Sequence, residues 1–163
     1  MATNEQLFIK MVLDAWKTQV VRTTKLIDSL SDDDLQREVA PGRNTGTYLL
    51  GHLTAIHDAL FSLMRFGERL YTNYDEVFVE TPDNSGLPKP SLNEIRTAWH
   101  RVNENLDKYF SALTAVEWFQ RHAAISETDF EKEPHRNRLN VVMNRTAHLA
   151  NHLGQLTFLK ARA

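Results

Sequence analysis

The spacing of apolar residues is the feature that most limits how this 163-residue chain can fold. Four segments place apolar residues at alternating three- and four-residue steps, which gives each segment one apolar face when it is coiled as an α-helix. They span about residues 4–30, 45–66, 91–113 and 137–163. No segment shows the strict alternation that is typical of a half-buried strand. We therefore predict an all-α protein.

Residues between these segments indicate how the helices are connected. The stretch 68–90 is the longest irregular part, and it is rich in Pro, Asn and Gly near its end. Such a length suits a crossover between the two ends of a bundle better than a tight hairpin. We expect one domain, residues 1–163, that folds as a four-helix bundle with a long crossover between helices two and three. A helical domain with another connectivity is the alternative.

Local signals set the limits of the helices. Thr45 or Thr47 is placed to cap the second helix, and Ser91 with Glu94 forms a capping box before the third. We expect residues 31–34 to be a solvated loop and residues 114–136 to hold one or two short helices. In the third helix, the predicted apolar stripe consists of Ile95, Trp99, Val102, Leu106, Tyr109 and Leu113.

Composition excludes several classes of function. The net charge of -2 argues against a nucleic-acid partner, because such domains usually carry a basic patch. The absence of cysteine excludes disulfides and thiolate metal sites, so any metal ligand must be histidine, carboxylate or carbonyl. No stretch approaches 18 apolar residues, and the first residues do not resemble a signal peptide. We expect a cytoplasmic protein without a membrane partner.

Two histidines in the fourth segment carry the main chemical signal. His148 and His152 are four residues apart, so they lie about 40° apart around a helix with Cβ atoms roughly 5–6 Å from one another. Two imidazoles in this arrangement can bind one metal ion. Gln155 and Asn144 lie on the same side and are candidates for hydrogen bonds to the ligands. The same face carries Val141, Leu156 and Leu159.

A third histidine lies within the apolar face of the second segment. His52 shares that face with Ile56, Ala59 and Leu63. A buried imidazole needs a polar partner, which is either a backbone carbonyl or a metal ion shared with the other two histidines. Three histidines from two helices would leave coordination positions open, as catalytic metal sites require. His57 lies at the edge of this face, where it either packs at the boundary or supports a ligand.

These residues resemble a known family. The run from Thr47 to Leu53, which contains Gly51 and His52, and the pattern His148-x-x-x-His152-x-Gly-Gln-Leu together resemble the DinB/YfiT-like superfamily. The resemblance implies a small bacterial four-helix bundle with His52, His148 and His152 as metal ligands. Relatives often carry two further histidines in the last helix. Here these positions are Asn144 and Asn151, which become candidates for hydrogen bonds to the ligands.

The resemblance also suggests what the protein does. It implies a divalent metal ion, such as Zn or Ni, that lowers the pKa of a bound thiol or water. The leading hypothesis is a metal-dependent enzyme, either a thiol-dependent S-transferase with a low-molecular-weight thiol as cosubstrate or a hydrolase. Because dimers are common in the family, the resemblance also implies a homodimer. The second is a non-catalytic metal-binding or ligand-sensing bundle. The third is a helical interaction module in which the histidines are buried polar residues without a metal.

Overall fold

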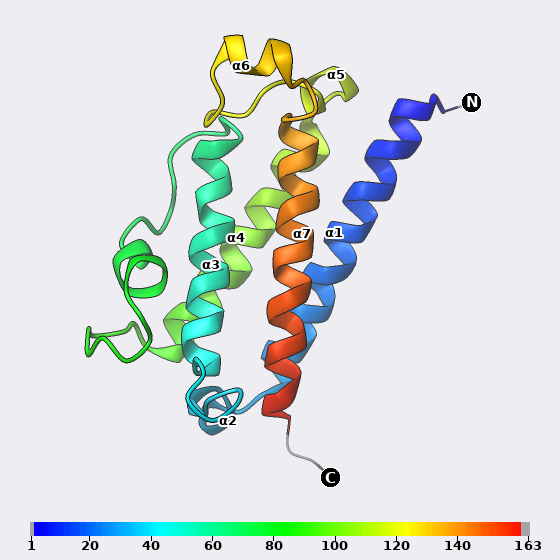
Figure 1. The fold of residues 1–163 in the computed structure, drawn as a ribbon. Coiled ribbons are helices and arrows are strands. Elements are labelled where there is room, and N and C mark those ends of the chain that lie inside the picture. Colours follow the sequence, from blue (N-terminus) through cyan, green and yellow to red (C-terminus); the bar gives the residue numbers. More distant parts are fainter. Residues whose placement is uncertain (1, 161–163) are drawn as a thin grey trace.

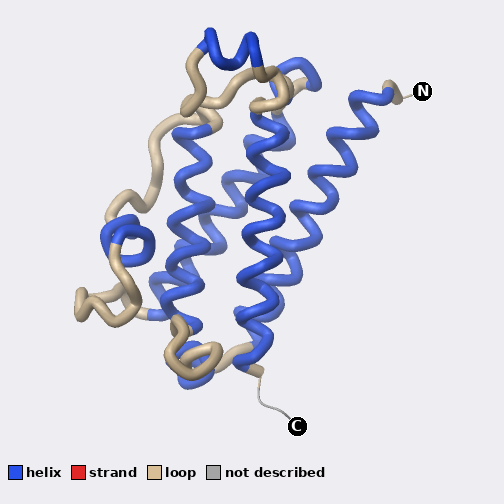
Figure 2. The backbone as a smooth tube through the Cα atoms, in the orientation of Figure 1, coloured by secondary structure: helices blue, strands red, loops and turns tan. Residues whose placement is uncertain are grey.

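The computed structural model describes residues 2–160, and within them it contains helices and no strand (Figure 2). The all-α prediction is confirmed. The elements are α1 (Asn4–Ser29), α2 (Asp32–Gln36), α3 (Gly46–Leu63), the π-helix η1 (Glu76–Glu80), α4 (Leu92–Ala112), α5 (Ala115–Trp118), α6 (Glu127–Lys132), α7 (Arg138–Leu156) and the 3₁₀-helix η2 (Thr157–Leu159).

The four long helices form a bundle in which α1 packs against α7 and α3 packs against α4. In Figure 1, α3 and α4 both run from the lower end to the upper end, while α1 and α7 run in the opposite direction. Residues 64–91 make this possible, because they return the chain along the outside of α3. The π-helix η1 lies within this crossover and packs against α3.

Side-chain caps begin the long helices, and those of α3 and α4 are at residues that the sequence predicts. Thr45 accepts a hydrogen bond from the backbone N–H of Tyr48 and caps α3. Ser91 and Glu94 form the predicted capping box of α4. Such caps satisfy backbone N–H groups that have no partner within a helix. Between α4 and α7, the chain forms the two short helices α5 and α6.

The structure corrects two local expectations. The acidic residues after Ser31 form the helix α2 rather than a loop, because Ser31 and Asp34 make a reciprocal capping box and acidic groups suit a helix N-terminus. In α4, Tyr109 is 41% exposed and Phe110 is buried in its place. The reason is the helical period of 3.6, which favours a four-residue step after Leu106.

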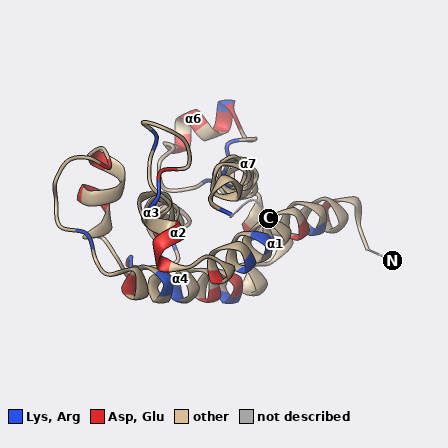
Figure 3. Cartoon of the chain, turned by 90° about the horizontal axis from the view of Figure 1, so that it is seen from below, with Lys and Arg blue, Asp and Glu red and all other residues tan. Residues whose placement is uncertain are grey.

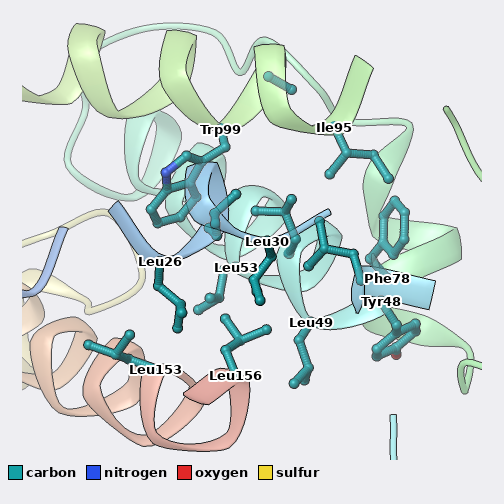
Figure 4. Close-up of a cluster of buried hydrophobic side chains, with 14 of the residues drawn as sticks. Leu26, Leu30, Tyr48, Leu49, Leu53, Phe78, Ile95, Trp99, Leu153 and Leu156 are labelled. Carbon is teal, nitrogen blue, oxygen red and sulfur yellow. The ribbon is translucent and has the colours of Figure 1, made fainter. Parts of the chain in front are cut away.

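The interior contains two adjoining apolar clusters. Figure 4 shows the lower cluster, where side chains from all four long helices and from Phe78 of the crossover converge. The upper cluster includes Trp16, Phe61 and Trp118. Acidic and basic residues are mixed along the outer faces of α1 and α4 (Figure 3). Among residues 2–160, no helix is both long and apolar enough to cross a membrane.

Candidate metal centre

Three imidazoles from two helices converge between α3 and α7. His52 comes from the second turn of α3, and His148 and His152 come from successive turns of α7. The Nε2 atom of His148 lies 3.2 Å from Nε2 of His52 and 3.1 Å from Nε2 of His152. All three ligand atoms lie within 4.8 Å of one another. We call these residues the histidine cluster, and each of its side chains is half-buried.

Protein oxygens fix the orientation of two of these rings. Nδ1 of His52 donates to the backbone carbonyl of Phe78 at 2.8 Å, because a carbonyl oxygen only accepts. Nδ1 of His152 lies 3.2 Å from Oε1 of Gln155, which accepts in the same way. The proton is therefore on Nδ1 in both rings, and the Nε2 lone pairs face the common centre.

This arrangement fits a divalent metal ion. A tetrahedral ion with metal–nitrogen bonds of about 2.0–2.1 Å requires nitrogens that are roughly 3.3 Å apart, close to the distances measured between the Nε2 atoms. Lone pairs that face one another at this distance repel unless a proton or a cation lies between them. Three imidazole nitrogens suit Zn, Ni, Cu or Fe.

The electrostatics of the cluster favour neutral imidazoles, the form that binds metals. Burial lowers the pKa of His148 to about 4, with further contributions from His152 and His52. Burial also lowers the pKa values of His52 and His152. Hydrogen bonds to the Phe78 carbonyl and to Gln155 oppose these shifts without cancelling them.

A close approach of the crossover positions His52. A Cβ atom added at Gly51 would lie only 2.4 Å from the ring of Phe78, so only glycine allows η1 to pack this tightly on α3. Tyr48 stacks near His52 with a centroid distance of 6.4 Å, and its hydroxyl donates to the carbonyl of Thr81 at 2.6 Å. Besides the bond to His52, the crossover is thus held against α3 at the ring of Phe78 and at the carbonyl of Thr81.

The histidine cluster borders an open cavity of about 490 Å³. His152 and Gln155 of α7 line this cavity together with Phe158 of η2 and the loop between α2 and α3. The lining residues of this loop are Val39, Ala40, Gly42, Arg43 and Asn44. The volume is enough for a small molecule to reach the cluster from this side.

The structure differs from the expectation for His57. This residue is fully buried rather than at a boundary, and its ring lies between those of Trp16 and Trp99, with centroid distances of 4.7 and 5.0 Å. Its Nδ1 is 2.8 Å from Oδ1 of Asn103, and burial lowers its pKa to about 3. His57 is a neutral core residue that makes no hydrogen bond to the histidine cluster.

Of the other residues proposed to hydrogen-bond the histidine ligands, one does so and two do not. Gln155 contacts His152, as described above. Asn144 and Asn151 are exposed, and neither makes a hydrogen bond to a histidine of the cluster. Two groups that affect the histidine cluster were not identified from the sequence. The Phe78 carbonyl, which accepts from His52, carries no side-chain signal. Arg145, whose charge lowers the pKa of His148, precedes His148 by three residues and thus shares its side of α7.

Comparison with known proteins agrees with this architecture. The model of the family described as the DinB superfamily matches residues 15–156, which is most of the chain. No curated protein sequence matches the chain.

Proposed function

This chain belongs to the DinB superfamily, and from that premise we propose that it binds one divalent metal ion through His52, His148 and His152 and uses the ion in an enzymatic reaction. The observation that carries this proposal is the convergence of three Nε2 atoms, two of them on rings whose Nδ1 protons are held by protein oxygens. Half-buried imidazoles whose Nε2 atoms face one another in this way are explained by a shared cation.

Zn or Ni is the ion that we expect, with a low-molecular-weight thiol or water as the nucleophile. When bound, such an ion lowers the pKa of that nucleophile, which suits a thiol-dependent S-transferase or a hydrolase. The contribution of the protein is to orient the imidazoles and to admit a small substrate through the cavity beside His152. Half-burial of the histidine cluster supports this open arrangement.

We assign no general base from this chain. Among residues 2–160, no carboxylate joins the group of three histidines. Asp58, which follows His52 on α3, already accepts hydrogen bonds from Arg69 and from the backbone N–H groups of Leu70 and Tyr71. His57 is sequestered in the core. Proton transfer is therefore assigned to the substrates or to solvent.

A non-catalytic metal-binding or ligand-sensing bundle is the second candidate. The ligands come only from α3 and α7, so an ion would also tie these two helices together. Melting temperatures with and without a chelator distinguish the candidates. A structural ion contributes to folding itself, so its removal would unfold the protein near room temperature. An enzyme with a self-sufficient core would remain folded and lose only its activity.

Elemental analysis of protein purified without a histidine tag tests the proposal. We expect about one equivalent of metal in the wild type, none in His148→Ala and one in His135→Ala, because His135 is exposed and distant in sequence from the cluster. The proposal fails if the wild type remains metal-free after incubation with Zn or Ni. It also fails if His148→Ala retains a full equivalent.

We also propose that the protein is a homodimer, as the family resemblance implies, and that it acts in the cytoplasm. Leu7, Phe8 and Met11 leave apolar surface exposed near the start of α1, which supports an association of this kind. Light scattering coupled to size-exclusion chromatography measures the mass in solution. A mass equal to that of one chain at micromolar concentration would contradict the dimer.

A further inference from the structure

Arg145 lies one helical turn before His148 on α7 and has no partner within the described part of the chain. Its side chain is half-buried, and its Nε atom is buried without a hydrogen bond. No carboxylate of residues 2–160 lies within ion-pair distance of its guanidinium group. A buried charge without a counter-charge is unfavourable, so its presence calls for a reason.

Two other arginines with buried side chains differ from Arg145. Arg69 donates to both Asp58 and Asp75, so the fold supplies its counter-charge. Arg138 also has a buried Nε atom without a hydrogen bond, but it is the first residue of α7, ten residues before His148. Arg145 lacks an ion pair within the described residues, burial lowers its pKa, and it lies one helical turn from a histidine of the cluster.

Helical spacing places Arg145 beside the histidine cluster. It precedes His148 by three residues and His152 by seven, so the three side chains share one side of α7. The charge of Arg145 lowers the pKa of His148, in agreement with this placement.

The local charge favours an anion at this position. With three neutral imidazoles, a divalent ion and a guanidinium give a net charge of +3, and no carboxylate of the described residues joins the group. The planar fork of an arginine binds the two oxygens of a carboxylate or phosphate at once.

We propose that Arg145 binds a carboxylate or phosphate group of the substrate and holds it beside the histidine cluster. This inference rests on the proposed function, because it names the substrate class of the same site. The substrate is then a small anion whose charged group lies at Arg145.

Titration with two simple anions tests this assignment. Inorganic phosphate and acetate would each be added to zinc-loaded and to zinc-free protein, and binding would be followed by chemical-shift changes. We expect Arg145→Gln to weaken binding of at least one probe by about tenfold to a hundredfold, as expected for a lost charge-assisted hydrogen bond. Preference for phosphate or acetate identifies the anionic group.

One further variant separates the paired N–H donors of the Arg145 guanidinium from its charge, and a second serves as a control. Arg145→Lys keeps the charge but not the paired donors, so we expect an intermediate loss. Arg101→Gln removes an exposed arginine on α4 and should bind both probes as the wild type does. Circular dichroism checks folding, and if Arg145→Gln does not fold, the comparison of Arg145→Lys with wild type decides.

Metal content distinguishes failure of this inference from failure of the proposed function. If Arg145→Gln holds one equivalent of metal and binds both probes as tightly as wild type, the inference is overturned and the metal site stands. If wild type binds no metal, the titrations of zinc-free protein decide whether Arg145 binds an anion. Arg145-dependent binding would then support the anion site alone, and binding unchanged by Arg145→Gln would overturn it.

Discussion

The polar residues around Asp58 and those around His52 both lie on α3, and they differ in how fully their hydrogen-bonding groups are used. In the first group, which we call the aspartate cluster, Arg69 joins Asp58 to Asp75 through contacts of 2.5–3.0 Å. Backbone N–H groups of the crossover donate two further hydrogen bonds to the carboxylate of Asp58. In the histidine cluster, three Nε2 atoms face one another and Nδ1 of His148 has no partner in the described residues.

This difference indicates the role of each cluster. A complete cluster gains nothing from a ligand, so its effect is on stability, and it holds the crossover on α3. An incomplete cluster costs stability in the free protein and regains it when a ligand binds. The same logic separates the arginines, since Arg69 belongs to the complete group and Arg145 lies beside the incomplete one.

Breaking the complete cluster should have the largest effect on stability. We expect Arg69→Gln to lower the free energy of unfolding by about 3–5 kcal/mol, because Asp58 would remain buried without its charged partner. Urea unfolding measures this loss. The matched control Arg101→Gln should change stability by no more than about 0.5 kcal/mol. Equal stability of both variants would show that the two clusters do not differ as described.

Supplying the missing cation should stabilise only the histidine cluster. Zinc at about 100 times its dissociation constant should raise the free energy of unfolding of metal-free wild type by about 2.7 kcal/mol. His148→Ala should abolish this gain, whereas Asp75→Asn should retain it on a less stable protein. Thermal melting with and without zinc measures both. A zinc response that survives His148→Ala would assign the ion to other residues.

His57 lies on the same helix and tests burial without an ion. Its pKa in the folded protein is about 3, below the ordinary value of 6.5, so the unfolded chain takes up the proton first. Stability should therefore fall as the pH drops from about 6.5 towards 3, by up to about 1.4 kcal/mol per pH unit from this group. His57→Gln should flatten the slope, measured with chelator present. An unchanged slope would mean that His57 is not held neutral.

The packing that orients His52 can be weakened without removing a ligand. Gly51→Ala would press a methyl group into Phe78 and move η1, so we expect zinc affinity to fall about tenfold, or roughly 1.4 kcal/mol. Gly154→Ala is the matched control, because its added Cβ would meet no atom within 4 Å. Competition with a chelating dye measures both affinities. Equal zinc affinities of the two variants would show that the hydrogen bond from His52 to the carbonyl of Phe78 does not support metal binding.

The smallest expected effect has the opposite sign. Arg145→Met should raise the free energy of unfolding by about 1 kcal/mol, because an unpaired buried charge is replaced by an apolar side chain of similar length. Urea unfolding of the metal-free protein measures it. A loss as large as that of Arg69→Gln would reveal a partner for Arg145 and end the contrast between the two arginines.

Helical spacing was sufficient to predict the parts of this protein that depend on periodicity. The four long helices follow from which residues share a helix face, and the capping box at Ser91 follows from the Ser-x-x-Glu motif. Helix faces also placed each histidine on the inner side of its helix, whereas grouping His52 with His148 and His152 was a hypothesis that the family resemblance supported. The same reasoning was wrong where it ignored local hydrogen bonds, as at residues 31–34. It also placed His57 at the edge, because a helical wheel does not show that Trp16 and Trp99 cover its ring.

Contacts made by the crossover were beyond such reasoning. The partner of His52 is the backbone carbonyl of Phe78, and any residue type supplies a carbonyl. The aspartate cluster depends on where Arg69 and Asp75 fold back onto α3, which no periodicity specifies. Arg145 had a signal in its spacing from His148, but the absence of a counter-charge is visible only in three dimensions.

The bond between His52 and the Phe78 carbonyl has a thermodynamic consequence. Because one imidazole both accepts the ion through Nε2 and anchors η1 through Nδ1, metal affinity and docking of residues 64–91 form a linked equilibrium. Whatever loosens this segment lowers the affinity for the ion by the same factor by which the ion tightens the segment. Hydrogen exchange of η1 amides would report the occupancy of a site to which η1 contributes no ligand.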